Sequence, residues 1–178
     1  MERMNSKMDS QDINTISVIG AGLMGHGIAL QFAIFGYDVW LNDLSDDRLQ
    51  EGMANFHSNL ATLQSVGLID KEAAASVPSR VRTSTSIKES VADAGFVIEA
   101  VFEDLNLKRQ IFTQLDELSP AQAILASNTS SFMSSQLASA TKRPDKIIVA
   151  NWWNPPYLLP LVEVVKGPET SEKTIETT

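Results

Sequence analysis

The strongest constraint on the fold is a glycine-rich turn between a strand and a helix. The turn, GAGLMG, follows the β-branched run Ile13 to Ile19, and apolar residues at helical spacing run from Leu23 to Phe35. In such a unit the first glycine makes the turn, the second admits a pyrophosphate, and the third lets helix and strand pack closely. The helix N-terminus adds free N–H groups and positive potential. The motif therefore predicts a dinucleotide-binding turn made of Gly20, Ala21, Gly22, Leu23, Met24 and Gly25.

Strands and helices are predicted to alternate along the rest of the chain. Further strands are predicted at Tyr37 to Leu41, Val81 to Thr83, Phe96 to Val101, Ala123 to Ala126 and Val162 to Val165. Helices are predicted at Ser45 to Val66, Ala73 to Val77, Ile87 to Ala92 and Leu105 to Leu118. Such alternation implies βαβ units, with ligands bound beyond the carboxyl ends of the strands. We therefore predict an α/β fold, a Rossmann-type doubly wound, mainly parallel sheet with helices on both faces.

An acidic residue follows the second predicted strand, at the position that contacts ribose in dinucleotide sites. The carboxylate of Asp43 can accept hydrogen bonds from both hydroxyls of an adenosine ribose. A 2′-phosphate would need a cation beside this position, and the nearest, Arg48, lies a full turn into the following helix. The sequence therefore predicts NAD as the cofactor in preference to NADP.

Length indicates how the chain is divided. With 178 residues, of which 43% are hydrophobic, the chain can bury one core but is too short for two full domains. We expect a flexible tail over residues 1–12 and one NAD-binding domain over residues 13–178. Because a new helix begins after Gly167 and is cut at Thr178, we expect a piece of a longer protein whose second domain is absent from this chain.

Charge and composition exclude several classes of function. The net charge is −8 and the 14 lysines and arginines are scattered, which argues against binding to nucleic acid or to an anionic membrane surface. No apolar run approaches the length of a membrane span. The absence of cysteine excludes a thiolate nucleophile and a cysteine metal site, and agrees with a cytoplasmic location. We expect no metal, and a small-molecule substrate.

Four stretches, in this order, resemble the NAD-binding domain of the 3-hydroxyacyl-CoA dehydrogenase family. They are GAGLMGHGIA from Gly20, IEAVFE from Ile98, SNTSS from Ser127 and NWWNPPYLLPLVEVV from Asn151. The resemblance covers nearly all of residues 13–178. It implies an NAD-dependent oxidoreductase of fatty acid metabolism that moves hydride to or from the 3-hydroxy group of a 3-hydroxyacyl-CoA or 3-hydroxy acid. The missing domain would be helical, complete the substrate cleft and carry most contacts of a homodimer.

The resemblance also implies roles for individual residues. Glu103 and Lys108 would lie near the cofactor, Ser130 and Asn154 would contact the nicotinamide side and the substrate oxygen, and Glu163 would orient the catalytic base. Structural alternatives exist for three of them. Lys108 could be a solvated helix residue, Ser130 could also cap a helix, and Glu163 could be a surface acid on a strand.

The chain departs from the family at the catalytic base. Where the family has a histidine, three residues before the Asn-Pro pair, this chain has Asn151. An amide can donate a hydrogen bond but cannot accept a proton at neutral pH, and loss of a general base commonly costs about 10² to 10⁴ in rate. Neither His26 nor His57 is an obvious substitute, so the base would come from the missing domain, from Glu163 through a water, or not exist.

Two hypotheses remain at this point. In the first, the chain is the cofactor domain of an active dehydrogenase with Asn151, Glu163 and Ser130 at its catalytic site; the retention of Ser130, Asn154 and Glu163 favours it. In the second, the chain is an NAD-binding module with lost or altered catalysis.

The substrate is also open. The only cation between Ser45 and Val66 is Arg48, whereas relatives acting on CoA thioesters tend to carry lysines there, and the sequence around Tyr157 resembles the gulonate and carnitine dehydrogenase branch. Trp152 and Trp153 could wall the substrate cleft or pack against the sheet.

Overall fold

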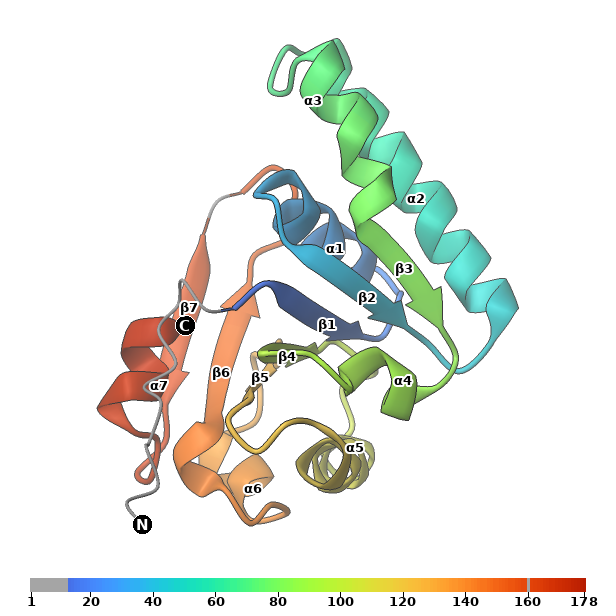
Figure 1. The fold of residues 1–178 in the computed structure, drawn as a ribbon. Helices are drawn as coiled ribbons and strands as arrows, with labels where there is room; N and C mark the ends of the chain where they lie inside the picture. Colours follow the sequence, from blue (N-terminus) through green and yellow to red (C-terminus); the bar gives the residue numbers. More distant parts are fainter. Residues whose placement is uncertain (1–12, 160) are drawn as a thin grey trace, which may run out of the picture.

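A single seven-stranded sheet organises the described chain. The computed structural model describes residues 13–159 and 161–178, so the tail predicted over residues 1–12 lies outside the described residues. The strand order is β3-β2-β1-β4-β5-β6-β7 (Figure 1). Strands β1 to β6 pair in parallel, and β7 pairs antiparallel with β6. The predicted doubly wound, mainly parallel fold is therefore confirmed.

The elements closely follow the predicted pattern. The strands are β1 Thr15–Ile19, β2 Asp38–Asn42, β3 Val81–Ser84, β4 Phe96–Glu99, β5 Ile124–Ser127, β6 Ile147–Trp152 and β7 Val162–Lys166. The α-helices are α1 Gly25–Ile34, α2 Asp46–Ser65, α3 Lys71–Ser76, α4 Ile87–Val91, α5 Leu105–Leu118, α6 Ser134–Ala138 and α7 Glu172–Thr177. Short 3-10 turns span Val77–Arg80 and Pro144–Lys146. Among the described residues, no helix has both the length and the apolarity that a membrane span needs.

No element is predicted between Ala126 and Val162, whereas the structure has α6 and β6 there. Helix α6 has five residues, too few to show a helical period. Strand β6 is an apolar run without alternation, because both of its faces are buried over Ile147 to Ala150.

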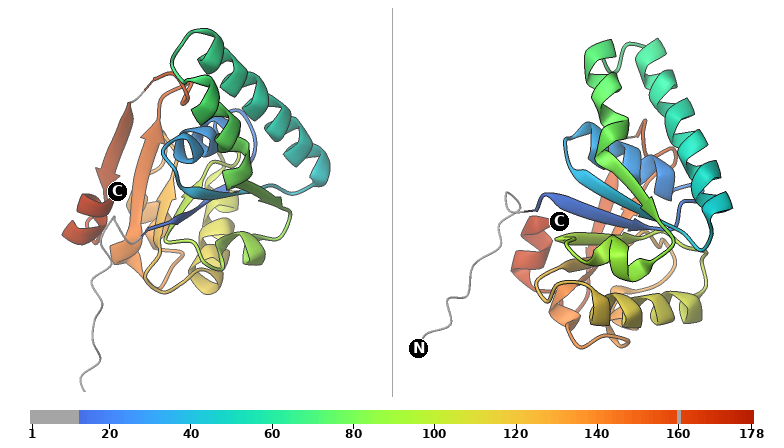
Figure 2. Two further views of the ribbon diagram at one scale, coloured as in Figure 1. Left: turned by 45° about the horizontal axis from the view of Figure 1, so that its top comes forward. Right: turned by 45° about the vertical axis from the view of Figure 1, so that its right-hand side comes forward.

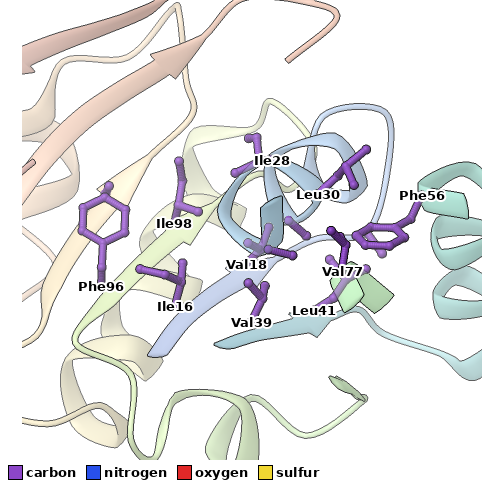
Figure 3. Packing of buried hydrophobic residues seen from close by; sticks show 14 of the residues in the cluster. Ile16, Val18, Ile28, Leu30, Val39, Leu41, Phe56, Val77, Phe96 and Ile98 are labelled. Atoms are coloured by element: carbon purple, nitrogen blue, oxygen red, sulfur yellow. The ribbon is translucent and has the colours of Figure 1, made fainter. Parts of the chain in front are cut away.

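Alternate residues of the central strands fill two cores, one on each face of the sheet. Ile16 and Val18 of β1 face the core under α1 and α2, which also holds Ile28 and Phe56 (Figure 3). Ile19 belongs to the opposite core, under α4, α5 and α6. Burial on both faces explains why the strands read as continuous apolar runs. The two cores bury both faces of the sheet, and the loops that form the site extend from the carboxyl ends of its buried strands.

Two close approaches of backbone fix the glycine turn against its neighbours. A Cβ atom at Gly25 would lie 1.7 Å from the carbonyl oxygen of Gly20, so α1 can start beside β1 only without a side chain there. A Cβ at Gly52 would lie 2.8 Å from the side chain of Ala21, which places α2 directly against the turn. Figure 2 shows α2 and α3 extending together beyond the β3 side of the sheet.

The glycine contacts predict a contrast in stability between two alanine variants. Gly25→Ala forces backbone atoms apart and should lower the free energy of unfolding by about 2 kcal/mol or more. At Gly22 an added Cβ meets no atom within 4 Å, so Gly22→Ala should change that free energy by less than about 1 kcal/mol. Urea unfolding of both variants measures the difference. Equal stabilities would contradict the packing role of Gly25.

Candidate functional site

A cavity of about 600 Å³ lies at the carboxyl ends of the central strands. Its lining includes loops that follow β1, β2, β4 and β5, the edge where a doubly wound sheet binds its ligand. Many of the predicted site residues line it, namely Gly20, Gly22, Leu23, Met24, Asp43, Glu103, Lys108 and Ser130. Apolar side chains complete the wall, including Leu44, Ile87 and Phe102.

The glycine turn presents open backbone to this cavity. Gly20 has a φ of +103°, a conformation that favours glycine, and a Cβ there would lie 2.7 Å from the oxygen of Ala100. Gly22 has open space in front of it. Helix α1 begins without a side-chain cap, whereas Ser45 and Asp104 cap α2 and α5. No side chain therefore occupies the first N–H groups of α1, and apart from that of His26, which donates to Gly22 O at 3.4 Å, they are available to an anion such as a pyrophosphate.

Asp43 connects the turn to the end of β2. One carboxylate oxygen, Oδ2, accepts from the N–H of Ala21 at 2.7 Å, and the other, Oδ1, accepts from the N–H of Leu44 at 2.7 Å. Each oxygen keeps a second lone pair that can accept a ribose hydroxyl. Arg48 lies 3.9 Å from Oδ1, with its side chain 65% exposed. Asp43 is thus held by the backbone and retains the capacity to bind a ligand.

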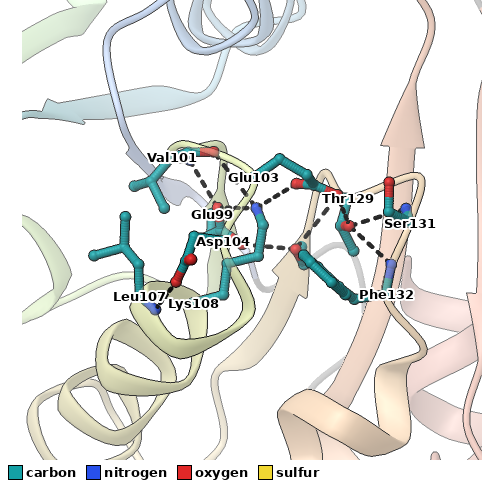
Figure 4. Close-up of polar contacts among 10 residues, drawn as sticks. Glu99, Val101, Glu103, Asp104, Leu107, Lys108, Thr129, Ser131 and Phe132 are labelled. Carbon is teal, nitrogen blue, oxygen red and sulfur yellow. Dashed lines mark hydrogen bonds and ion pairs between the residues drawn. The ribbon is translucent and has the colours of Figure 1, made fainter.

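Lys108 is the centre of a buried charge cluster (Figure 4). Its Nζ donates to Glu99 Oε1 at 2.7 Å and lies 3.0 Å from Glu103 Oε2. The side chains of Lys108 and Glu99 are 1% and 0% exposed, whereas that of Glu103 is 38% exposed. The alternative that Lys108 is a solvated helix residue is therefore wrong, because burial makes it part of this ion-pair network.

The same network holds the loop that carries Ser130. Ser127 Oγ donates to Glu99 Oε2 at 2.6 Å, and the hydroxyl of Thr129 donates to Glu103. Thr129 Oγ1 in turn accepts from the N–H groups of Ser131 and Phe132, each at 3.1 Å. The loops after β4 and β5 are thus joined beside the cavity. Sequence reasoning missed Glu99, although a glutamate inside an apolar strand is itself a signal of a buried partner.

One structural expectation for Ser130 is wrong. Helix α6 begins at Ser134, four positions further on, so Ser130 does not cap it. The turn at Ser130 is instead anchored by the neighbouring Thr129, which leaves Ser130 exposed at the cavity.

The environment of Glu103 keeps its carboxyl group ionised. Burial alone would raise the pKa of Glu103, but hydrogen bonds from Thr129 and Lys108, together with the positive charge of Lys108, outweigh it and lower the pKa below 4.5. The cavity therefore contains a carboxylate at neutral pH.

Two of the three residues predicted for catalysis, Asn151 and Glu163, lie on the neighbouring strands β6 and β7, whereas Ser130 lies in the loop after β5. Asn151 and Glu163 are register partners, and Asn151 Nδ2 donates to Glu163 Oε2 at 2.8 Å. Because a carboxylate only accepts, this bond turns the amide NH₂ toward Glu163 and leaves Asn151 Oδ1 free. Glu163 is exposed. The resemblance implies that Glu163 contacts and orients the residue at position 151. In this chain Glu163 makes that contact, but to the amide of Asn151.

A second cavity of about 590 Å³ adjoins the first and contains Asn154 and Ala21. The polar side chains of Glu51, Asn55 and Asn59 on α2 form one wall, and the segment from Asn154 to Tyr157 forms another. The two cavities share Gly22, Leu23, Asp43 and Arg48. The glycine turn therefore lies between the two cavities. The first is at the carboxyl edge of the sheet, and the second is open to a substrate.

The two histidines differ in burial, and so do the adjacent tryptophans Trp152 and Trp153. His26 is buried beside the turn, with Nδ1 2.7 Å from the carbonyl oxygen of Gly22, whereas His57 is exposed and packs on Phe56. Trp152 packs edge-on against Phe32, and Trp153 is 47% exposed. Within the described residues, no group of three or more metal-ligating side chains could hold a metal ion.

Comparison with known proteins identifies the family. The family model for the 3-hydroxyacyl-CoA dehydrogenase NAD-binding domain matches residues 15–178. The chain belongs to this family. A 3-hydroxybutyryl-CoA dehydrogenase of Bradyrhizobium diazoefficiens is 42% identical over 164 residues, which cover 92% of this chain and 56% of that protein. An L-carnitine dehydrogenase of Bacillus cereus is 35% identical over 98% of this chain and 52% of that protein.

Solved structures of the family share the fold. A crystal structure of 3-hydroxybutyryl-CoA dehydrogenase from Escherichia coli superposes with a TM-score of 0.88 at 35% identity, over 92% of this chain and 34% of that one. The family and its cofactor, NAD, are therefore confirmed as the sequence predicts. The chain spans about half the length of the curated relatives described above.

The lowered pKa of Glu103 predicts a pH-dependent contribution to stability. A carboxyl group with a lowered pKa in the folded state stabilises the fold above its unfolded pKa, and this contribution is lost as pH falls through the folded value. The free energy of unfolding of the wild type minus that of Glu103→Gln should therefore be largest above pH 4.5 and shrink below it. Urea unfolding across this range measures the difference, with the exposed Glu117→Gln as control. A difference that does not vary with pH would contradict the assignment.

Proposed function

We propose that this chain binds NAD in the cavity at the carboxyl ends of β1, β4 and β5, as the cofactor domain of a dehydrogenase. The observation that carries the proposal is the convergence of an uncapped helix α1, an open Gly22 and a backbone-held Asp43 on one cavity. In this arrangement the N–H groups at the start of α1 bind the pyrophosphate, and Asp43 accepts hydrogen bonds from the adenosine ribose. Glu103, Lys108 and Ser130 then lie on the nicotinamide half.

The reaction that fits this arrangement is hydride transfer between NAD and the carbon of the 3-hydroxy group of a 3-hydroxyacyl-CoA or 3-hydroxy acid, with the hydroxyl proton passing to Glu163 through a water or to a base elsewhere in the full-length protein. When bound, NAD supplies the nicotinamide ring that accepts or returns the hydride. In the full-length protein Ser130 and Asn154 contact the substrate oxygen, and Asn151, oriented by Glu163, holds it through a hydrogen bond. The full-length protein acts in the cytoplasm as a homodimer on a small-molecule substrate.

The hydrogen bond between Asn151 and Glu163 also supports a second candidate function. An amide held by a carboxylate can position a substrate oxygen but cannot take its proton. A family member built in this way could bind NAD and serve as a binding module with lost or altered catalysis. The enzyme remains the preferred function, because Glu163 retains contact with the residue that it would orient in an active site.

The proposed NAD site predicts that a variant can keep the stability of the fold and still lose affinity for NAD. Gly22→Ala should fold normally and yet lose most NAD affinity, since the added Cβ occupies the open space that the pyrophosphate requires. Asp43→Ala should weaken NAD binding by roughly tenfold or more, because hydrogen bonds to a charged group are lost. Isothermal titration calorimetry measures both affinities, with the exposed Asp47→Ala as the matched charge control. Unchanged affinity in Asp43→Ala would contradict the ribose assignment.

Replacing Asn151 by histidine distinguishes the enzyme from the binding module. In the full-length protein, Asn151→His would place a proton acceptor beside Glu163, and the rate of hydride transfer should rise by about 10² to 10⁴. The assay follows NADH formation with a panel of 3-hydroxyacyl-CoAs and 3-hydroxy acids. Asn151→Gln, which keeps the amide, is the control and should give no gain.

The wild-type activity decides between the two functions. Measurable turnover by the wild type supports the enzyme. Turnover only by Asn151→His would contradict it and leave the binding module. Turnover by the wild type and loss in Asn151→His would instead reveal a base elsewhere in the full-length protein.

A further inference from the structure

The buried cluster beside the cavity carries an excess of negative charge. It contains two carboxylates, Glu99 and Glu103, and one ammonium group, Lys108, within ion-pair distance of both. Glu99 and Lys108 are almost wholly buried and neutralise each other at 2.7 Å. Lys108 and Glu103 both line the cavity, but Glu103 is the exposed member, with 38% of its side chain exposed against 1% for Lys108. One negative charge is therefore left over, and it lies on the cavity side.

Among the described residues that line this cavity, no other charge cancels that excess. Its charged lining residues are Asp43 and Arg48 beside β2, and Glu103 and Lys108 beside β4. Arg48 lies 3.9 Å from Asp43, so these two offset each other at the β2 end. The lowered pKa of Glu103 shows that its carboxylate keeps its charge at neutral pH. The negative end of the cavity is thus the end formed by the loops after β4 and β5.

That end is the one that meets the nicotinamide half of a dinucleotide. In a doubly wound sheet the cofactor crosses the point where the strand order reverses, with adenosine on the β1 and β2 side and the second nucleotide beyond β4 and β5. The nicotinamide ring carries a positive charge in NAD⁺ and none in NADH. An uncompensated carboxylate nearby therefore attracts the oxidised ring more strongly than the reduced one.

We propose that the cluster of Glu99, Lys108 and Glu103 makes this cleft selective for the oxidised cofactor, with Glu99 as the positioning residue that neutralises Lys108. This inference rests on the proposed NAD site. Without the charge of Glu99, the positive charge of Lys108 cancels that of Glu103 and the cluster becomes neutral. Glu99 thus acts on the cofactor through Lys108, without touching the cavity.

The ratio of two dissociation constants tests this role and separates it from a purely structural one. Calorimetry on the 178-residue chain gives the Kd for NADH divided by the Kd for NAD⁺. Removing one nearby unit charge at the effective dielectric of a protein surface should lower this ratio by about fivefold in Glu99→Gln and in Glu103→Gln. A loss of packing alone would weaken both ligands equally and leave the ratio unchanged. Glu117→Gln, at the far end of α5, removes the same charge and should not alter the ratio.

Each outcome has a distinct meaning. A lower ratio in both variants supports the proposal. A lower ratio in Glu103→Gln alone would overturn the role of Glu99, and an unchanged ratio in both would overturn the selectivity. Should Glu99→Gln fail to fold, Glu103→Gln, which changes a partly exposed side chain, still decides whether the cluster discriminates. Binding of neither NAD⁺ nor NADH by the wild type would refute the proposed function itself, and the selectivity with it.

Discussion

The close approach of helix α1 to strand β1 is the constraint on which the site depends. It requires the absence of a side chain at Gly25, where an added Cβ would lie 1.7 Å from the oxygen of Gly20. Because α1 starts there, its free N–H groups point to the edge of the sheet, and Asp43 can accept from Ala21 at 2.7 Å. The turn, the end of β2 and the cavity thus form one unit with little freedom to move.

A second constraint, the buried ion pair between Glu99 and Lys108, joins the loops on the other side of the turn. A buried pair gains little net stability, because desolvation offsets most of the attraction. Its value here lies in position and in charge. It anchors Ser127 at the end of β5 and leaves Glu103 as a carboxylate that faces the cavity. The two halves of the cleft therefore differ, since the β2 end is nearly balanced in charge and the β4 end is negative.

Much of this architecture is predictable from local sequence, and the exceptions have physical reasons. The turn from Gly20 to Gly25, Asp43 and helix α5 could be predicted because glycine, capping and periodic signals act over a few residues. Helix α6 is too short for a period, and the burial of Lys108 depends on Glu99, a partner nine positions away on another element. The catalytic role of Asn151 does not follow from the sequence. Its bond to Glu163 orients the amide, and an assay of hydride transfer tests whether this arrangement is catalytic.

The central claim, that the carboxyl-edge cavity is an NAD site oriented by the glycine turn, is tested most directly by a crystal structure of the chain with NAD⁺. The account predicts the pyrophosphate over Gly22 at the start of α1, the adenosine ribose on Asp43, and the nicotinamide ring on the side of Glu103 and Ser130. A dinucleotide in the reverse orientation, or one held in the cavity beside Asn55 of α2, would contradict it.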